Sequence, residues 1–209
     1  PSRDMTLGED GKRMIVYDAA SGKVCWDKEV HYTDPPILHG DRILAGGRGY
    51  MLLTGDTVMR DDPLTGKSIP WSYARSYGCN YPVAAENLLT FRSAAAGFYD
   101  LAGEGGVGNF GGFKSSCSSN LVAADGILNA PDYTRTCTCS YQNQTSLGFI
   151  HMPELEMWTR NDYKFRGGAI DRIGVNLGAP GDRRDSTGTL WLEYPSRGAP
   201  SPKVPIGVR

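Results

Sequence analysis

A repeated element near the front of this 209-residue chain limits its fold most strongly. An Asp is followed by Ser/Thr-Gly-Lys and then by Trp, in VYDAASGKVCW at 16–26 and in RDDPLTGKSIPW at 60–71. Trp26 and Trp71 are 45 residues apart. The Gly of each triplet is expected to supply the positive φ of a hairpin turn. The Trp after it can cover a neighbouring strand and bury a large area.

A second repeated element has the same spacing. It occurs as HGDRIL (39–44), AAENLL (84–89) and AADGIL (123–128), with starts 45 and then 39 residues apart. Each copy is interpreted as a polar turn that leads into an apolar strand, with another strand following at 49–53, 97–101 or 147–152. Turn-punctuated, strand-rich repeats of this length are typical of β-propellers, in which each repeat forms one blade. Helical repeats are disfavoured, because no apolar i, i+3, i+4 pattern exceeds about two turns.

The sequence therefore predicts an all-β chain with about three to four propeller blades in residues 1–160. Residues 161–209 lie outside the repeat and are predicted to be a C-terminal β extension or linker. In this part RIGVNLGAP (172–180) and TLWLEYP (189–195) are expected to be strands, added to the body or forming a small β appendix. In the second strand, Leu190, Leu192 and Tyr194 alternate with Trp191 and Glu193.

The composition of the chain limits the structural class and the kinds of partner that can be expected. The 27 Gly and 13 Pro favour many short elements over long helices. A net charge of −1 implies no polyanion partner such as a nucleic acid. No stretch approaches the roughly 18 apolar residues of a membrane span. The chain begins PSRDM without an initiating Met or a signal peptide, and is interpreted as a processed or truncated piece of something longer.

Four of the five cysteines lie in loops rich in Gly, Ser, Thr and Asn. An even set of loop cysteines suggests two disulfides that clamp adjacent blades, in a periplasmic or secreted protein. These residues are Cys79, Cys117, Cys137 and Cys139. Reduced thiols, or a metal site that uses cysteines with His151, are the alternatives. Cys25 stands apart in KVCW and is predicted to be a small core residue.

The cysteine spacing argues against several other sites. Cys137 and Cys139 are separated by one residue, whereas zinc knuckles place two to four residues between paired thiolates. The haem attachment pattern Cys-x-x-Cys-His is absent. No His lies close in sequence to any of these loop cysteines, so a thiol nucleophile with its base is not indicated.

A polar stretch around the last cysteines is the first candidate ligand site. It contains Arg135, Tyr141, Gln142 and Asn143. Amides hydrogen-bond hydroxyl groups in both directions and aromatic rings stack on C–H faces, which is the chemistry of sugar recognition. Alternatively, these side chains satisfy backbone groups of their own loop.

Other candidates come from the expected blade geometry. Asn109 and Phe110 lie in the Gly-rich stretch 103–117, which is predicted to be a long loop near the mouth of the propeller. Arg92 and Asn129 follow inner strands and are expected to line the axial channel, where propellers commonly hold ligands. Channel polar groups that bind only water are the alternative. In GAPGDRRDSTG (178–188), Asp182 and Asp185 could bind an ion, but a solvated turn with internal Asp–Arg pairing is preferred.

The Asp, Ser/Thr-Gly-Lys and Trp element resembles the tryptophan-docking repeat of quinoprotein-like β-propellers. That group contains pyrroloquinoline-quinone (PQQ) alcohol dehydrogenases and many scaffolds without a cofactor. Residues 75–158 further resemble the last blades of exported PQQ-like repeat proteins of environmental bacteria. The resemblance covers roughly residues 10–160. Such propellers have about seven or eight blades, so it implies that the remaining blades or another chain complete the structure.

The resemblance also sets the expected function. A quinoprotein dehydrogenase holds a planar cofactor beside a Trp, with a Ca²⁺ ion and a catalytic Asp. Asn129 and Asp132 lie close in sequence, but two oxygen ligands do not make a six- to eight-oxygen site. We therefore expect a binding or assembly module without a cofactor, recognising carbohydrate or a protein partner, rather than an enzyme. The alternatives are an oxidoreductase that uses PQQ with Ca²⁺ or a cysteine-bound metal, and a polysaccharide-degrading enzyme built on a propeller.

Overall fold

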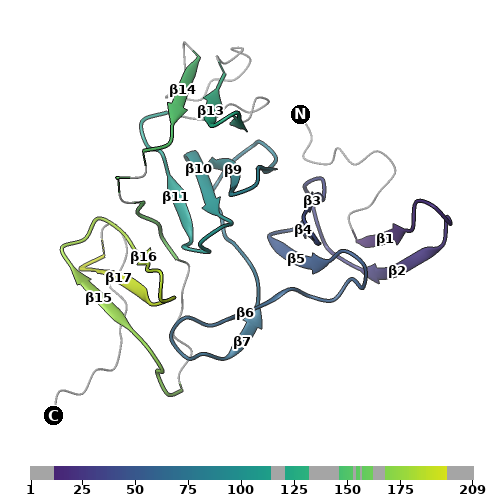
Figure 1. Cartoon of the computed structure of the whole chain (residues 1–209), viewed down its shortest axis with the longest axis horizontal. Coiled ribbons are helices and arrows are strands. Elements are labelled where there is room, and N and C mark those ends of the chain that lie inside the picture. The colour runs from purple at the N-terminus through teal and green to yellow at the C-terminus, as the bar shows by residue number, and fades with distance from the viewer. Residues whose placement is uncertain are drawn as a thin grey trace.

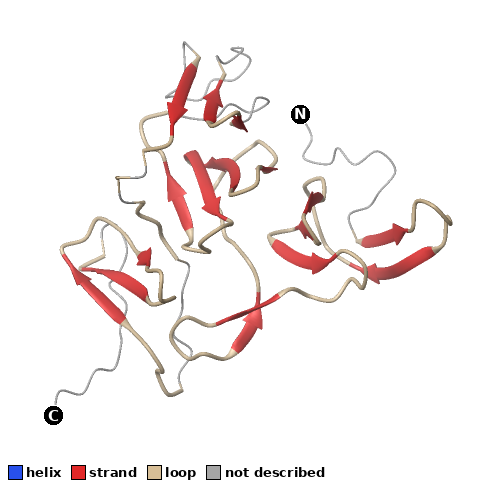
Figure 2. Ribbon diagram, in the orientation of Figure 1, coloured by secondary structure: helices blue, strands red, loops and turns tan. Residues whose placement is uncertain are grey.

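The computed structural model describes residues 12–113, 121–131, 146–152, 154–155, 157–161 and 168–196. These residues form strands, turns and loops, and no helix occurs among them (Figure 2). The predicted all-β class is thus confirmed. Within these ranges there is accordingly no helix that could cross a membrane.

The first third of the chain folds into two hairpins and a meander between them (Figure 1). β1 (Arg13–Tyr17) pairs with β2 (Val24–Glu29), and β6 (Met59–Asp61) pairs with β7 (Ser68–Pro70). The meander consists of β3 (Ile37–His39), β4 (Arg42–Ala45) and β5 (Arg48–Met51), all antiparallel. Isolated bridges from Tyr50 to Thr57 and from Arg48 to Ser72 connect β5 with the second hairpin.

Two further antiparallel sheets follow. The four-stranded sheet has the order β11-β10-β9-β8, made of β8 (Val83–Ala84), β9 (Leu88–Ser93), β10 (Ala95–Asp100) and β11 (Val107–Asn109). The next sheet contains β12 (Val122–Ala124), β13 (Ile127–Ala130) and β14 (Leu147–Ile150).

The C-terminal part forms a sheet of its own, with the order β15-β17-β16. β15 (Gly174–Leu177) runs parallel to β17 (Leu190–Tyr194), while β16 (Arg183–Arg184) is antiparallel to it. Both predicted strands are therefore present. The alternation expected in the second one fails at its end, because Glu193 is buried and Tyr194 is 46% exposed. The proposed boundary after residue 160 stays a prediction.

The registers of the hairpins show that the strands β3–β5, β8–β10 and β12–β14 are equivalent three-stranded meanders. His39 pairs with Arg42, the N–H of Ala85 donates to the carbonyl oxygen of Leu88, and Ala124 pairs with Ile127. Counted from these hairpins, two buried positions are equivalent in β4, β9 and β13. They hold Ile43, Leu89 and Leu128, and two residues later Ala45, Phe91 and Ala130.

Each of these residue pairs belongs to a separate core cluster. The first cluster joins Trp26 and Met14 to Ile43 and Ala45. The second joins Leu44, Val58 and Trp71 to Leu89, Phe91 and Tyr99. The third joins Ala96 to Leu121, Leu128 and Ala130. In these three clusters a sheet packs a face against the sheet that follows it in the chain, from β1–β2 as far as β12–β14. Trp26 and Trp71 occupy equivalent interfaces.

In both Asp turns Oδ1 of the Asp accepts the N–H three residues further on, as expected of a repeat. Oδ1 of Asp18 accepts the N–H and the hydroxyl of Ser21, both at 2.7 Å. Oδ1 of Asp62 accepts the N–H groups of Leu64 at 3.0 Å and Thr65 at 2.9 Å. The glycines that follow have φ values of 67° at position 22 and 64° at position 66.

The prediction that Cys25 is a core residue is wrong, since its side chain is exposed on β2. Its neighbour Trp26 is buried in the first cluster. Successive side chains of a strand point to opposite faces, so burial of Trp26 turns Cys25 outward.

Candidate functional site

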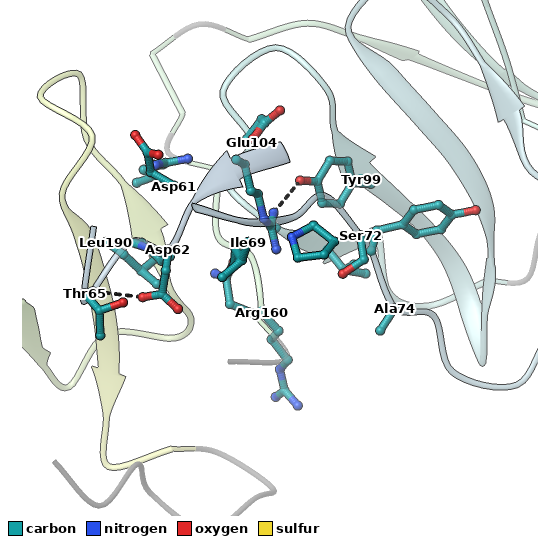
Figure 3. Close-up of a pocket in the computed structure, with 18 of the residues that line it drawn as sticks. Asp61, Asp62, Thr65, Ile69, Ser72, Ala74, Tyr99, Glu104, Arg160 and Leu190 are labelled. Atoms are coloured by element: carbon teal, nitrogen blue, oxygen red, sulfur yellow. Dashed lines mark hydrogen bonds between the residues drawn. The ribbon is translucent and has the colours of Figure 1, made fainter. Parts of the chain in front are cut away.

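A pocket of about 650 Å³ lies where separate parts of the chain meet (Figure 3). The β6–β7 hairpin supplies one wall, and Tyr99 with Glu104, Gly106 and Val107 supplies another. Arg160, Asn161, Arg184 of β16 and Leu190 of β17 line it from the C-terminal side. The segment between these walls is held by two bridges, from Val107 to Arg160 and from Thr159 to Asp182.

Charged side chains from several elements surround this pocket. The cationic ones are Arg48, Arg60, Lys67, Arg160 and Arg184. The acidic ones are Asp61, Asp62 and Glu104. Figure 3 shows these side chains around the pocket, with Asp61 and Glu104 on one side and Arg160 on the other. The lining therefore carries more positive than negative charge.

Arg60 and Tyr99 form the central polar contact of the pocket. Nη1 of Arg60 donates to the hydroxyl of Tyr99 at 3.1 Å. Nε of Arg60 is buried and has no hydrogen-bond acceptor. Burial raises the pKa of Tyr99 to about 12, although the nearby charge of Arg60 opposes this shift. At neutral pH the half-buried guanidinium therefore contacts a neutral phenol.

Two of the three carboxylates already have structural partners. Asp62 stabilises its own turn through the N–H groups of Leu64 and Thr65. Oε1 of Glu104 lies 3.6 Å from Nη1 of Arg42, which does not line the pocket. Asp61 ends β6 and is exposed.

Apolar side chains make up the rest of the walls. Ile69 and Pro70 come from β7, Val107 from β11 and Leu190 from β17. Such walls beside polar groups are typical of sites for small organic molecules.

The predicted channel residue Arg92 lies elsewhere. It is 2% exposed, and its guanidinium stands 5.3 Å from the ring centroid of Tyr77. The backbone N–H of Arg92 donates to Oδ1 of Asn80 at 2.8 Å, and Nη1 of its side chain is 3.9 Å from Sγ of Cys79. Arg92 thus ties the loop before β8 to β9.

The other predicted ligand residues that the structure describes are also outside the pocket. Asn109 ends β11, where its Oδ1 accepts the N–H of Gly111 at 2.6 Å. Phe110 packs against the third core cluster, with its ring centroid 4.8 Å from that of Phe98. Asn129 is exposed on β13, and its Nδ2 lies 3.4 Å from the carbonyl oxygen of Val122.

The remaining predicted residues fall outside the described ranges. For sugar recognition these are Arg135, Tyr141, Gln142 and Asn143; for the disulfides, Cys117, Cys137 and Cys139. Sγ of the fourth cysteine, Cys79, lies 3.4 Å from the hydroxyl of Tyr77. The two disulfides and the polar groove stay predictions. Among the described residues, no group of three or more His, Cys, Asp or Glu side chains is placed to hold a metal ion.

The Asp–Arg pairing predicted for residues 178–188 is wrong. Asp182 is buried, and its two carboxylate oxygens accept the N–H groups of Glu193 at 2.9 Å and Asn161 at 3.0 Å. Oδ2 of Asp185 accepts the indole N–H of Trp191 at 2.8 Å. This bond and those from Thr187 lower the pKa of Asp185. The carboxylate of Asp182 therefore accepts hydrogen bonds from backbone N–H groups, and that of Asp185 accepts one from an indole.

No family model, curated protein or solved structure matches the chain. The pocket is a site that sequence reasoning missed. Its cationic residues are spread from position 48 to position 184, so no local spacing indicates that they meet. One signal was present, because Arg60 and Lys67 flank the second copy of the repeated Asp turn.

Proposed function

We propose that the chain is part of a β-propeller of the quinoprotein-like class and acts as a binding or assembly module. The observation that supports this most is the repeated interface between consecutive sheets. Ile43, Leu89 and Leu128 occupy equivalent positions, and each is packed against the sheet before it in the chain. Blades that stack around an axis use such face-to-face contacts.

The last of these sheets leaves an apolar face exposed. Val122 is 48% exposed, Ile127 42% and Ile150 72%. By register, Val122 corresponds to Ile37 and Ile150 to Met51. Ile37 and Met51 are partly buried against the second core cluster. The equivalent face on β12–β14 is therefore suited to a further sheet, from the remaining blades or from another chain.

In this proposal the module is exported and recognises carbohydrate or a protein partner. The pocket beside Arg60 supports binding, since its volume of about 650 Å³ is in the range of small-molecule sites. The competing oxidoreductase that uses PQQ with Ca²⁺ makes a different prediction. An ultraviolet–visible spectrum with a quinone band and stoichiometric metal in the purified protein would favour the enzyme.

The assembly proposal is tested on the open face. The double variant Ile127→Lys with Ile150→Lys places two charges where a further sheet would pack. We expect it to reduce association in size-exclusion chromatography with light scattering, and to leave the thermal midpoint unchanged. The control is Leu177→Lys on β15, because Leu177 is 78% exposed but lies outside the repeated sheets.

Two results would count against the proposal. One is association that responds equally to the control and to the double variant. The other is a chain that stays monomeric at every concentration and binds nothing on a glycan array.

A further inference from the structure

We propose that the pocket beside Arg60 binds a small organic carboxylate. This inference deepens the proposed binding function and rests on it, but it does not require further blades. The pocket is lined by residues of the hairpin β6–β7, of β10 and β11, and of the C-terminal side, all within the described structure.

The first argument is the charge on Arg60. Its guanidinium is half-buried and contacts the Tyr99 hydroxyl, and its Nε has no acceptor. A partly buried cation whose partner is neutral has lost hydration without gaining a counter-charge. An anionic group in the pocket would supply the missing counter-charge. Arginine is well suited to carboxylates, because its planar donors match their two oxygens.

The second argument is that the neighbouring charges do not cancel. In the described structure, Arg48 and Lys67 form no ion pair, and Nε of Arg184 donates to the carbonyl oxygen of Gly188 at 3.2 Å. Asp62 is engaged in its turn and Glu104 with Arg42. An excess of cations in a cleft attracts anions through the summed field.

The third argument concerns the body of the ligand. A volume of about 650 Å³ exceeds what a bare inorganic anion fills. Ile69, Pro70 and Leu190 present apolar surface beside the charged groups. A carboxylate attached to a carbon framework contacts both kinds of surface, as a sugar acid or another organic acid would.

The repeat provides a matched control for the test. In each Asp turn a Lys follows the Gly: Lys23 in the first turn and Lys67 in the second. The backbone carbonyl oxygen of each Lys accepts the N–H of the Asp that begins its turn, at 2.8 Å. Lys67 lines the pocket and Lys23 does not. Lys67→Gln and Lys23→Gln therefore remove the same charge from the same local structure, at two different places.

The test is isothermal titration calorimetry with glucuronate, glucose, succinate and sulfate. Glucuronate carries a carboxylate where glucose carries a hydroxymethyl group, so comparing their affinities measures the contribution of the negative charge. We expect glucuronate to bind and glucose to bind at least about tenfold more weakly, as loss of a charge-assisted hydrogen bond implies. If succinate also binds, the site accepts organic acids in general. If succinate does not bind, the site is restricted to sugar acids.

The variants assign the binding to the pocket. Arg60→Gln is expected to weaken glucuronate binding about tenfold, with partial recovery in Arg60→Lys. Lys67→Gln is expected to weaken it and Lys23→Gln to leave it unchanged. Near-ultraviolet circular dichroism shows whether each variant keeps its fold, and Lys67→Gln tests the site even if Arg60→Gln unfolds.

Four results would overturn the inference: glucose binding as tightly as glucuronate, sulfate binding as tightly as glucuronate, equal effects of Lys67→Gln and Lys23→Gln, or no binding of either glucuronate or succinate. None of these outcomes alters the light-scattering result on Ile127 and Ile150. Failure of the pocket and failure of the assembly proposal are thereby distinguishable.

Discussion

The indole ring of Trp26 lies against the backbone of Gly55, so closely that a Cβ atom on Gly55 would stand 2.6 Å from Cδ2 of the ring. Gly55 has a φ of 68°, a conformation that residues with a side chain rarely adopt. Nε1 of Trp26 donates to the carbonyl oxygen of Leu52 at 2.8 Å. The turn after β5 thus covers the first core cluster.

Gly55→Ala is expected to lower the free energy of unfolding by roughly 3 kcal/mol, from the clash with the indole and the strained φ. Urea unfolding followed by tryptophan fluorescence measures this. Gly126→Ala is the control, because Gly126 has a φ of 75° but a Cβ there meets nothing within 4 Å. It should cost about 1 kcal/mol. Equal losses in the two variants would show that the indole contact is unimportant.

Asp182→Ala is expected to loosen the C-terminal sheet. The variant leaves the buried N–H of Glu193 and the partly buried N–H of Asn161 without their carboxylate acceptor. A cost of about 2–3 kcal/mol follows from unsatisfied buried groups. Hydrogen exchange should accelerate in β15–β17 before it does in β8–β11. The exposed Glu154 gives the control variant Glu154→Ala, and similar exchange in both variants would contradict this role.

Stability should fall in alkali because of two buried tyrosines. Burial raises the pKa of Tyr73 and of Tyr99 to about 12, from a usual value of 10.0. The unfolded chain loses these protons first, so the stabilisation is complete below pH 10 and is lost as the pH rises to 12. Absorbance at about 295 nm should show two late ionisations, one of which disappears in Tyr73→Phe. Tyr17→Phe, whose ring is 57% exposed, should leave both in place.

Stability should also fall in acid, because of the lowered pKa of Asp185. The indole N–H of Trp191 and the hydroxyl of Thr187 lower its pKa below the usual 3.8. Its contribution to stability is therefore present above about pH 4 and lost as the pH falls through the lowered folded value. Carboxyl NMR should place its titration below 3.8, and the Trp191 indole signal should move with it. A titration at or above 3.8, or an indole signal that moves equally in Asp185→Asn, would refute the contact.

Local chemistry explains what the sequence predicted correctly. The turns at Asp18 and Asp62 depend on side chains within three residues and on one positive φ, which are visible in a short stretch. The pairing of turn and Trp then indicated strands and a shared docking surface. The same reasoning located the three hairpins that begin β4, β9 and β13.

Local reasoning failed where burial depends on distant residues. Cys25 was assigned to the core from its apolar neighbours, although the adjacent Trp26 takes the inward position. Glu193 was expected to alternate with Leu192 and Tyr194 and to share a face with Trp191, but it is buried whereas Trp191 is 40% exposed. Arg60 and Arg184 line the same pocket although they lie in different sheets, and residue spacing in the sequence does not predict this proximity.

The three core clusters have a further consequence for how the chain is made. Each joins sheets that are neighbours in sequence, so every interface is complete once the next sheet has been synthesised. A chain leaving the ribosome can therefore bury its apolar surface stepwise from the N-terminal side, without waiting for its far end. A lesion at Trp26 would strike the earliest of these steps, whereas one at Leu128 would leave the two earlier ones intact.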